Sequence, residues 1–237
     1  MRLAAHPIRW RLLSALAATD LRVRELIGVV DEQQSLVSYH LRLLRDAGMV
    51  TANRSTLDGR DSYYHLDLDR CADQLAASGG ALHPALRQSL ATGVADAQAA
   101  YRPVAVLFVC TGNSARSPIA EALLRQATRG QVEVVSAGSH PKPRIHADAV
   151  RVLRDQFDID LADQRPRHLD EVADRRFDFV VTLCDKAREV CPELTDHPIH
   201  WSLPDPAAAG SDAAFADTAR EIHTRVRHLL PLLRTTL

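Results

Sequence analysis

A cysteine and an arginine separated by five small residues are the first feature of this chain that could do chemistry. The segment reads Cys110, Thr111, Gly112, Asn113, Ser114, Ala115, Arg116 and Ser117. Small residues let successive backbone N–H groups turn inward, and a guanidinium offers two parallel donors to the oxygens of a tetrahedral anion. We therefore predict an oxyanion-binding loop over residues 110–117, with Cys110 as a nucleophile and Arg116 as an anion ligand.

The segments on either side of this loop predict a strand before it and a helix after it. Residues 104–109 form an uninterrupted apolar run, which is typical of a buried parallel strand. Ser117 and Pro118 begin a helical pattern that extends to about residue 129. The amino end of such a helix adds positive potential, which attracts anions and favours the thiolate form of a cysteine.

A late Asp-Pro pair, Asp205-Pro206, extends the pattern. Together with the Cys-Arg loop, it makes residues 103–237 resemble the low-molecular-weight tyrosine phosphatase superfamily, in which the aspartate is the general acid. The resemblance assigns that role to Asp205. It also implies an α/β fold with a doubly wound sheet of four parallel strands, which we place at residues 104–109, 132–136, 177–183 and 199–201.

Two further cysteines, Cys184 and Cys191, distinguish this chain from a simple phosphatase. The segment around them is similar to that of the thioredoxin-coupled arsenate reductases, which share the phosphatase fold. The resemblance implies that Cys110 attacks arsenate, that Cys184 then attacks Cys110 and releases arsenite, and that Cys191 resolves the disulfide. Thioredoxin is the implied reductant, phosphate and sulfate are expected to bind as analogues of arsenate, and no cofactor or metal is expected.

The spacing of this cysteine pair makes a demand on the backbone. Seven residues of helix rise about 10 Å, whereas a disulfide needs Cα atoms about 4.4–6.8 Å apart. We therefore expect residues 184–191 to be at least partly helical when reduced and to loop outward when oxidised. The alternative is that both cysteines are buried side chains of one helix with no redox role.

The first 75 residues predict a helix–turn–helix followed by a two-stranded wing. Helical patterns cover residues 7–17, 21–30 and 35–47, and short strands are expected at 50–54 and 62–66. This order resembles the winged-helix repressors of the ArsR type. The resemblance makes polar residues of the third helix and arginines of the wing candidate contacts to double-stranded operator DNA. These candidates are Gln33, Gln34, Ser35, Ser38, Tyr39, His40, Arg42, Arg54 and Arg60.

Charge does not single out this part of the chain as a nucleic-acid binder. Residues 1–102 contain 12 arginines and 11 acidic residues, so a protein-interaction module is the alternative reading. In the repressor family a C-terminal helix pairs with the first helix across a two-fold axis. Residues 71–78 or 84–98 are candidates for that helix, and we expect a homodimer.

Length and composition indicate two domains, at residues 1–100 and 103–237. Gly79, Gly80 and Pro84 are expected to interrupt the helical region that joins them. No apolar run of about 18 residues and no signal-peptide pattern is present, so a cytoplasmic protein without a membrane segment is expected. Four cysteines in a chain of this length do not indicate a disulfide framework, Cys71 is expected to have no role beyond packing, and the histidines show no metal-binding spacing.

Three functions remain open at this point. The first is an arsenate reductase fused to an ArsR-type regulator. The second is a phosphatase fused to a repressor. The third is a regulator that uses its reductase-like domain as a sensor.

Overall fold

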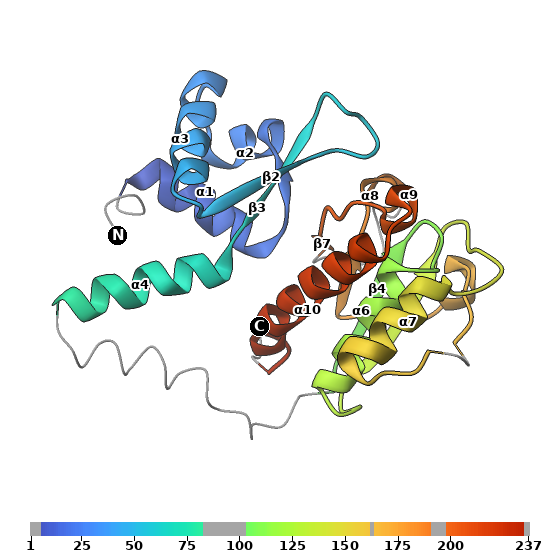
Figure 1. The fold of residues 1–237 in the computed structure, drawn as a ribbon. Coiled ribbons are helices and arrows are strands. Elements are labelled where there is room, and N and C mark those ends of the chain that lie inside the picture. Colours follow the sequence, from blue (N-terminus) through green and yellow to red (C-terminus); the bar gives the residue numbers. More distant parts are fainter. Residues whose placement is uncertain (1–5, 83–102, 162–163, 191–197, 235–237) are drawn as a thin grey trace. The chain divides into compact units, whose positions relative to one another are not determined.

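A computed structural model describes residues 6–82, 103–161, 164–190 and 198–234 (Figure 1). The chain divides into two compact units, Met1–Ala99 and Ala100–Leu237. Each unit has its own hydrophobic core. They are therefore described separately.

The first unit has the predicted helix–turn–helix–wing order. It contains α1 (Pro7–Ala18), β1 (Leu21–Arg22), α2 (Val23–Val30), α3 (Gln34–Asp46), β2 (Val50–Arg54), β3 (Ser62–Leu66) and α4 (Leu68–Leu82). The strands form an antiparallel sheet in the order β1-β3-β2. Buried leucines and valines from α1, α2 and α3 fill the space between these helices and the sheet.

Two expectations for this unit are wrong. Leu21 and Arg22 were expected to begin a helix, but they pair with β3, and α2 begins at Val23. The Glu25 carboxylate accepts a hydrogen bond from the Arg22 N–H over 2.7 Å, which fixes the helix start there. Gly79 and Gly80 were expected to interrupt the next helix, but α4 continues through them to Leu82.

The second unit contains the predicted parallel sheet of four strands. These are β4 (Ala105–Cys110), β5 (Glu133–Gly138), β6 (Phe179–Thr182) and β7 (Pro198–His200), in the order β5-β4-β6-β7. Strand β4 lies between β5 and β6 and is almost wholly buried, which explains its apolar sequence. The prediction of a doubly wound α/β fold is confirmed.

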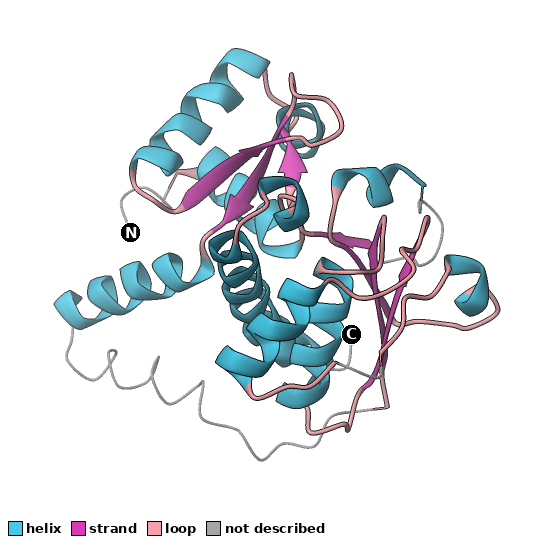
Figure 2. Cartoon of the chain, turned by 45° about the vertical axis from the view of Figure 1, so that its right-hand side comes forward, coloured by secondary structure: helices cyan, strands magenta, loops and turns pink. Residues whose placement is uncertain are grey.

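Helices connect these strands and cover the sheet (Figure 2). They are α6 (Arg116–Ala127), α7 (Ala147–Phe157), the 3-10 helix η1 (Leu169–Val172), α8 (Asp185–Val190), α9 (Pro206–Ala209) and α10 (Asp212–Arg234). Helix α6 packs on β4 and β5, and α10 packs against α6 and α7. In the part of the chain that the structure describes, no helix has both the length and the apolar character needed to cross a membrane.

Candidate active site

The candidate active site lies where β4, β5 and β6 end. Cys110 is the last residue of β4, and it is in register with Gly138 at the end of β5. On the other side of β4, Val109 is paired with Thr182, and the Leu183 N–H donates to the Val109 carbonyl over 2.7 Å. Cys184 therefore follows β6 at the same edge of the sheet at which Cys110 ends β4.

The loop after Cys110 presents backbone N–H groups to one side. Its carbonyl oxygens at Thr111, Gly112 and Ser114 accept hydrogen bonds from the N–H groups of His140, Lys142 and His146 over 2.8, 2.9 and 2.8 Å. A trans peptide holds its N–H opposite to its carbonyl, so the next amides point away from the segment 139–146. Within the described residues these amides make no hydrogen bond to protein, and they are free to bind an anion.

Two residues give the loop its tight curvature. Asn113 has a φ of 43°, in the left-handed region that asparagine adopts more readily than most residues. Gly138, on β5, lies directly behind the loop. A Cβ atom on Gly138 would stand 2.6 Å from the Thr111 carbonyl oxygen and 2.9 Å from the Asn113 nitrogen. The strand can approach the loop this closely because Gly138 has no side chain.

Arg116 is a buried cation held over the loop. Its side chain is 8% exposed, and Nη1 donates to the Leu203 carbonyl over 2.9 Å. Nη2 lies 3.3 Å from Oδ2 of Asp205, whose side chain is 47% exposed. Asp205 also caps α9 by accepting from the Ala207 N–H. The cation and the proposed acid, 89 positions apart in the sequence, are thus in contact.

A chain of hydrogen bonds leads to the Cys110 sulfur. The Asn113 Oδ1 accepts from the Arg167 N–H over 2.8 Å, which orients the amide so that its NH₂ group faces Ser117 at 2.9 Å. Because the amide donates to Ser117 Oγ, the hydroxyl proton of Ser117 is directed at Cys110 Sγ, 2.9 Å away. This arrangement stabilises a thiolate on Cys110.

Sequence reasoning missed the buried polar group that supports Asn113 from behind. The same NH₂ group donates to Ser136 Oγ, which donates to the wholly buried Glu121 carboxylate over 2.5 Å. Glu121 also accepts from Gln164 over 2.7 Å and pairs with Arg125. Only Ser136 carried a signal, as the end of the predicted second strand. Glu121 is indistinguishable in sequence from a surface residue of a helix.

Cys184 is a buried free thiol beside the loop. Its sulfur lies 3.4 Å from Thr111 Oγ1, in the residue that directly follows Cys110. It also accepts from the Ala187 N–H over 3.4 Å, in the first turn of α8. A thiolate on Cys184 would be able to accept a hydrogen bond at both contacts. The helix occupies residues 185–190, and Cys191 lies outside the described residues.

A second network of buried hydrogen bonds, which the sequence analysis also did not predict, holds the start of α8 in place. Asp185 is 1% exposed and accepts from Ser202 Oγ over 2.8 Å and from His200 Nε2 over 3.1 Å. The other ring nitrogen of His200 lies 2.9 Å from Thr182 Oγ1. The residue after Cys184 is therefore anchored to β7 and β6 by buried hydrogen bonds.

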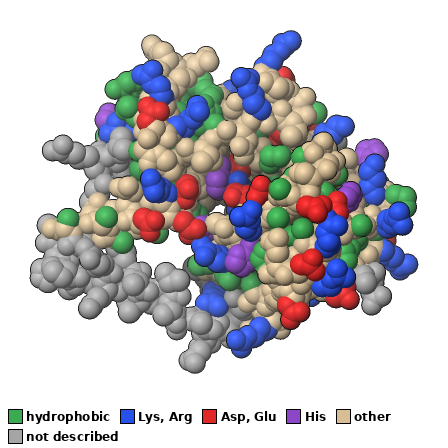
Figure 3. Space-filling view, in the orientation of Figure 1, with side chains coloured by type: hydrophobic (Ala, Val, Ile, Leu, Met, Phe, Trp, Pro, Cys, Tyr) green, Lys and Arg blue, Asp and Glu red, His purple; other side chains and the backbone are tan. Residues whose placement is uncertain are grey.

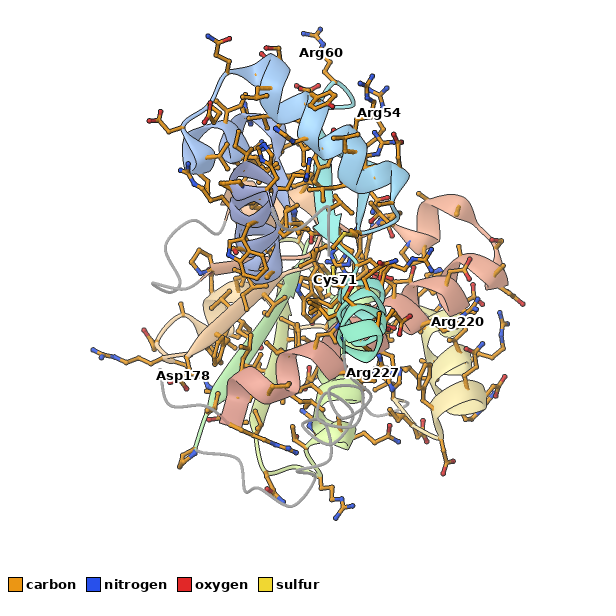
Figure 4. All side chains as sticks on the ribbon, turned by 90° about the vertical axis from the view of Figure 1, so that its left-hand side faces the viewer. Arg54, Arg60, Cys71, Asp178, Arg220 and Arg227 are labelled. Atoms are coloured by element: carbon orange, nitrogen blue, oxygen red, sulfur yellow. The ribbon has the colours of Figure 1, made fainter. Side chains whose placement is uncertain are left out.

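In the first unit, α3 and the wing present most of the candidate DNA contacts. Gln33, Gln34, Ser35, Ser38, Tyr39 and Arg42 are exposed, and the Arg42 guanidinium lies over the Tyr39 ring. Arg54 and Arg60 point outward from the wing (Figure 4). On the face seen in Figure 3, basic and acidic side chains are interspersed, in keeping with the small net charge of −1.

His40 differs from the other candidates because it faces inward. It is 3% exposed, and its ring packs against that of His6, with 4.5 Å between the centroids. Burial lowers the pKa of His40, and the nearby His6 and Arg9 lower it further. Its Nδ1 has no hydrogen-bond partner among the described residues. His40 is thus placed to join α3 to the start of α1 rather than to reach a base.

Among the described side chains, no three histidine, cysteine or acidic residues form a group that could hold a metal ion. Comparison with protein-family models gives two matches. Residues 105–237 match the low molecular weight phosphotyrosine protein phosphatases. Residues 6–52 match the bacterial regulatory proteins of the arsR family.

Individual relatives match the second unit. Arsenate reductase 1 of Bacillus cereus is 34% identical over 125 residues, which cover 52% of this chain and 90% of that protein. Arsenate reductase of Halalkalibacterium halodurans is 33% identical over 129 residues, covering 52% and 91%. Among solved structures, an arsenate reductase in the phosphate binding state aligns with a TM-score of 0.50 at 26% identity, covering 55% of this chain and 98% of that one.

Proposed function

Because the chain belongs, through residues 105–237, to the low molecular weight phosphotyrosine protein phosphatase family, we propose that this unit reduces arsenate to arsenite. The observation that carries the proposal is the second thiol. Phosphatase chemistry on this loop needs Cys110 alone, whereas Cys184 is a buried thiol within hydrogen-bonding distance of the residue that follows Cys110. The unit is joined to an ArsR-family segment, and we propose that the whole chain is a reductase fused to a DNA-binding regulator.

The first step uses the loop as an oxyanion site. The Cys110 thiolate, held by the Ser117 hydroxyl, attacks arsenic while Arg116 and the loop amides bind the remaining oxygens. Asp205 transfers a proton to the departing oxygen, which leaves as water. A bond forms between sulfur and arsenic, an arsenic–oxygen bond breaks, and arsenic remains pentavalent.

The second step is the reduction. The Cys184 thiolate attacks Cys110 Sγ, a disulfide forms, and the sulfur–arsenic bond breaks with its electron pair remaining on arsenic. Trivalent arsenite leaves. Cys191 then attacks Cys184, which frees Cys110, and the resulting Cys184–Cys191 disulfide is reduced by an external dithiol, for which we propose thioredoxin.

Helix α8 must open during this relay. Its six residues separate Cys184 from Cys191, and a helical path between them is about 10 Å long, too long for a disulfide. The buried contacts of Asp185 with Ser202 and His200 hold the first residue of α8 in place. We therefore propose that the turn after Asp185 unwinds and presents the disulfide to the reductant.

Substituting each thiol in the full-length chain tests the proposal. Thioredoxin, its reductase and NADPH would report arsenate turnover, and p-nitrophenyl phosphate would report phosphatase turnover. We expect Cys110→Ser to abolish both and Cys184→Ser to abolish arsenate turnover alone. Cys71→Ser, which removes a half-buried thiol in the other unit, is the control. Arsenate turnover that survives Cys184→Ser would show that Cys184 is not the second thiol of the relay, whereas p-nitrophenyl phosphate turnover without any arsenate turnover in the original chain would support a phosphatase.

The phosphatase alternative has less support at the substrate site. Phosphotyrosine hydrolysis needs a surface on which an aryl ring can stack, but α9 after Asp205 consists of one proline and three alanines. A small inorganic anion suits this surface better. A unit that served only as a sensor would need Arg116 to bind the anion, but it would not need an acid such as Asp205 in contact with Arg116.

For the first unit, we propose binding to a double-stranded operator as a homodimer. Exposed polar residues at the start of α3 and the two wing arginines suit the major groove and the backbone. Trp10 on α1 is 60% exposed and Leu75 on α4 is 44% exposed, which supports pairing of these helices between two copies. Sedimentation would test the homodimer, with Trp10→Ser as the variant. Binding of a DNA fragment from upstream of the chain's own gene would test operator binding, with Ser38→Ala as the variant.

A further inference from the structure

Only two of the 29 basic residues in this chain are lysines, Lys142 and Lys186. Lys142 lies in the segment 139–146, whose N–H groups bind the carbonyl oxygens of the oxyanion loop. Its own N–H donates to the Gly112 carbonyl over 2.9 Å. The backbone of Lys142 is thus fixed to the candidate active site, although its side chain is exposed.

The side chain of Lys142 runs along the loop. Its Cγ lies 3.3 Å, and its Cε 3.9 Å, from the point where a Cβ on Gly112 would stand. The absence of a side chain on Gly112 therefore leaves room for the lysine stem. The ammonium group is one bond beyond Cε, so it lies beside Gly112, whose N–H faces the anion site.

The charge balance of the site explains what such an ammonium would add. Before an anion binds, the Arg116 guanidinium lies 3.3 Å from the Asp205 carboxylate, which offsets part of its positive charge. Lys142 forms no ion pair with any residue in the described ranges. Arsenate and phosphate are largely dianionic near neutral pH, so an uncompensated cation at the rim favours their binding.

We propose that Lys142 is a specificity-determining residue that raises the affinity of this site for dianionic tetrahedral oxyanions. It acts as a charge at the rim of the loop and takes no part in bond making. If the separation between ammonium and dianion is taken as about 6 Å in water, Coulomb's law gives a change in affinity of about tenfold at low salt and about threefold at physiological salt. The inference deepens the proposed arsenate chemistry and rests on it for the identity of the substrate.

Binding of inorganic phosphate tests the role of Lys142 in anion affinity without any redox step. Calorimetry on the reduced full-length chain would compare the original protein with Lys142→Met, which keeps the stem and removes the charge, and with Lys142→Arg, which keeps the charge. Arg144→Gln removes an exposed cation two residues away in the same segment and is the matched control. We expect Lys142→Met to weaken binding about tenfold at low salt and about threefold at physiological salt, with Lys142→Arg and Arg144→Gln within twofold of the original.

Two results would overturn the inference. One is unchanged phosphate affinity in Lys142→Met at low salt. The other is an equal loss in Arg144→Gln, because general surface charge would then explain the effect. Arsenate kinetics add a second readout, in which KM rises in Lys142→Met while kcat stays within twofold. A chain that binds phosphate in this charge-dependent way but does not reduce arsenate would contradict the proposed function and leave the role of Lys142 intact.

Discussion

Replacing Gly138 by alanine would push the sheet against the oxyanion loop. The new Cβ would stand 2.6 Å from the Thr111 carbonyl oxygen, 2.9 Å from the Asn113 nitrogen and 3.0 Å from the Asn113 Cβ. Two of these three contacts are with backbone atoms of the loop, and Gly138 is itself fixed by its pairing with Cys110 on β4. No flexible side chain can relieve the overlap, so the loop must move.

The size of that movement follows from the distances. Ordinary carbon–oxygen contact begins near 3.4 Å, so the loop must retreat by roughly 0.5–0.8 Å. A misplacement of about 1 Å costs about a hundredfold in rate, and we expect Gly138→Ala to lower kcat/KM for arsenate by ten- to a hundredfold. Overpacking of this kind also destabilises a domain by about 1–3 kcal/mol.

Gly112→Ala is the matched comparison, because Gly112 is itself a residue of the oxyanion loop. Its added Cβ would meet Lys142 Cγ at 3.3 Å and Ser114 Oγ at 3.4 Å, both of them side-chain atoms that can give way. Arsenate turnover in the coupled assay, phosphate binding and urea unfolding would be measured for both variants. Activity near that of the original chain in Gly138→Ala, or a greater loss in Gly112→Ala, would refute the reasoning.

Three further outcomes are expected. Ser117→Ala removes the hydroxyl directed at Cys110, so alkylation of Cys110 by iodoacetamide at pH 7 slows about tenfold or more; an unchanged rate would contradict the hydrogen-bond chain. Asp205→Asn keeps the cap of α9 but removes the acid, so kcat for arsenate falls at least about a hundredfold while phosphate binding, relieved of a negative charge beside Arg116, is no weaker. The lowered pKa of His40 means that the folded chain resists protonation there, so the stability of the first unit is full above about pH 6.5 and declines as the pH falls below it; calorimetric melting between pH 8 and pH 5.5 should show this decline, and His40→Gln should flatten it.

Local sequence signals predicted the elements that carry the site. The apolar run before Cys110 and the Arg-Ser-Pro start after it were enough to predict the strand, the loop and the helix, because each depends on neighbours a few residues away. The wing strands were predicted at their observed bounds for the same reason. Errors occurred where a distant partner overrode a local preference, as at Leu21 and Arg22, which pair with β3.

The supporting partners of the site had no such local signal. Leu203 and Asp205 meet Arg116, Ser136 meets Asn113, and Thr111 meets the Cys184 sulfur. Each of these pairs is more than 20 positions apart, and it forms because the order β5-β4-β6-β7 brings particular strand ends together.

Residue types and short spacings thus established which groups are available for chemistry: thiols, a guanidinium, a carboxylate and a loop rich in amides. The direction of each donor, the burial of each charge and the inward turn of His40 were settled by folding. A hydrogen bond or a desolvated charge depends on atoms a few ångströms away in space, and the chain path that brings those atoms together is set by packing of the whole sheet and its helices.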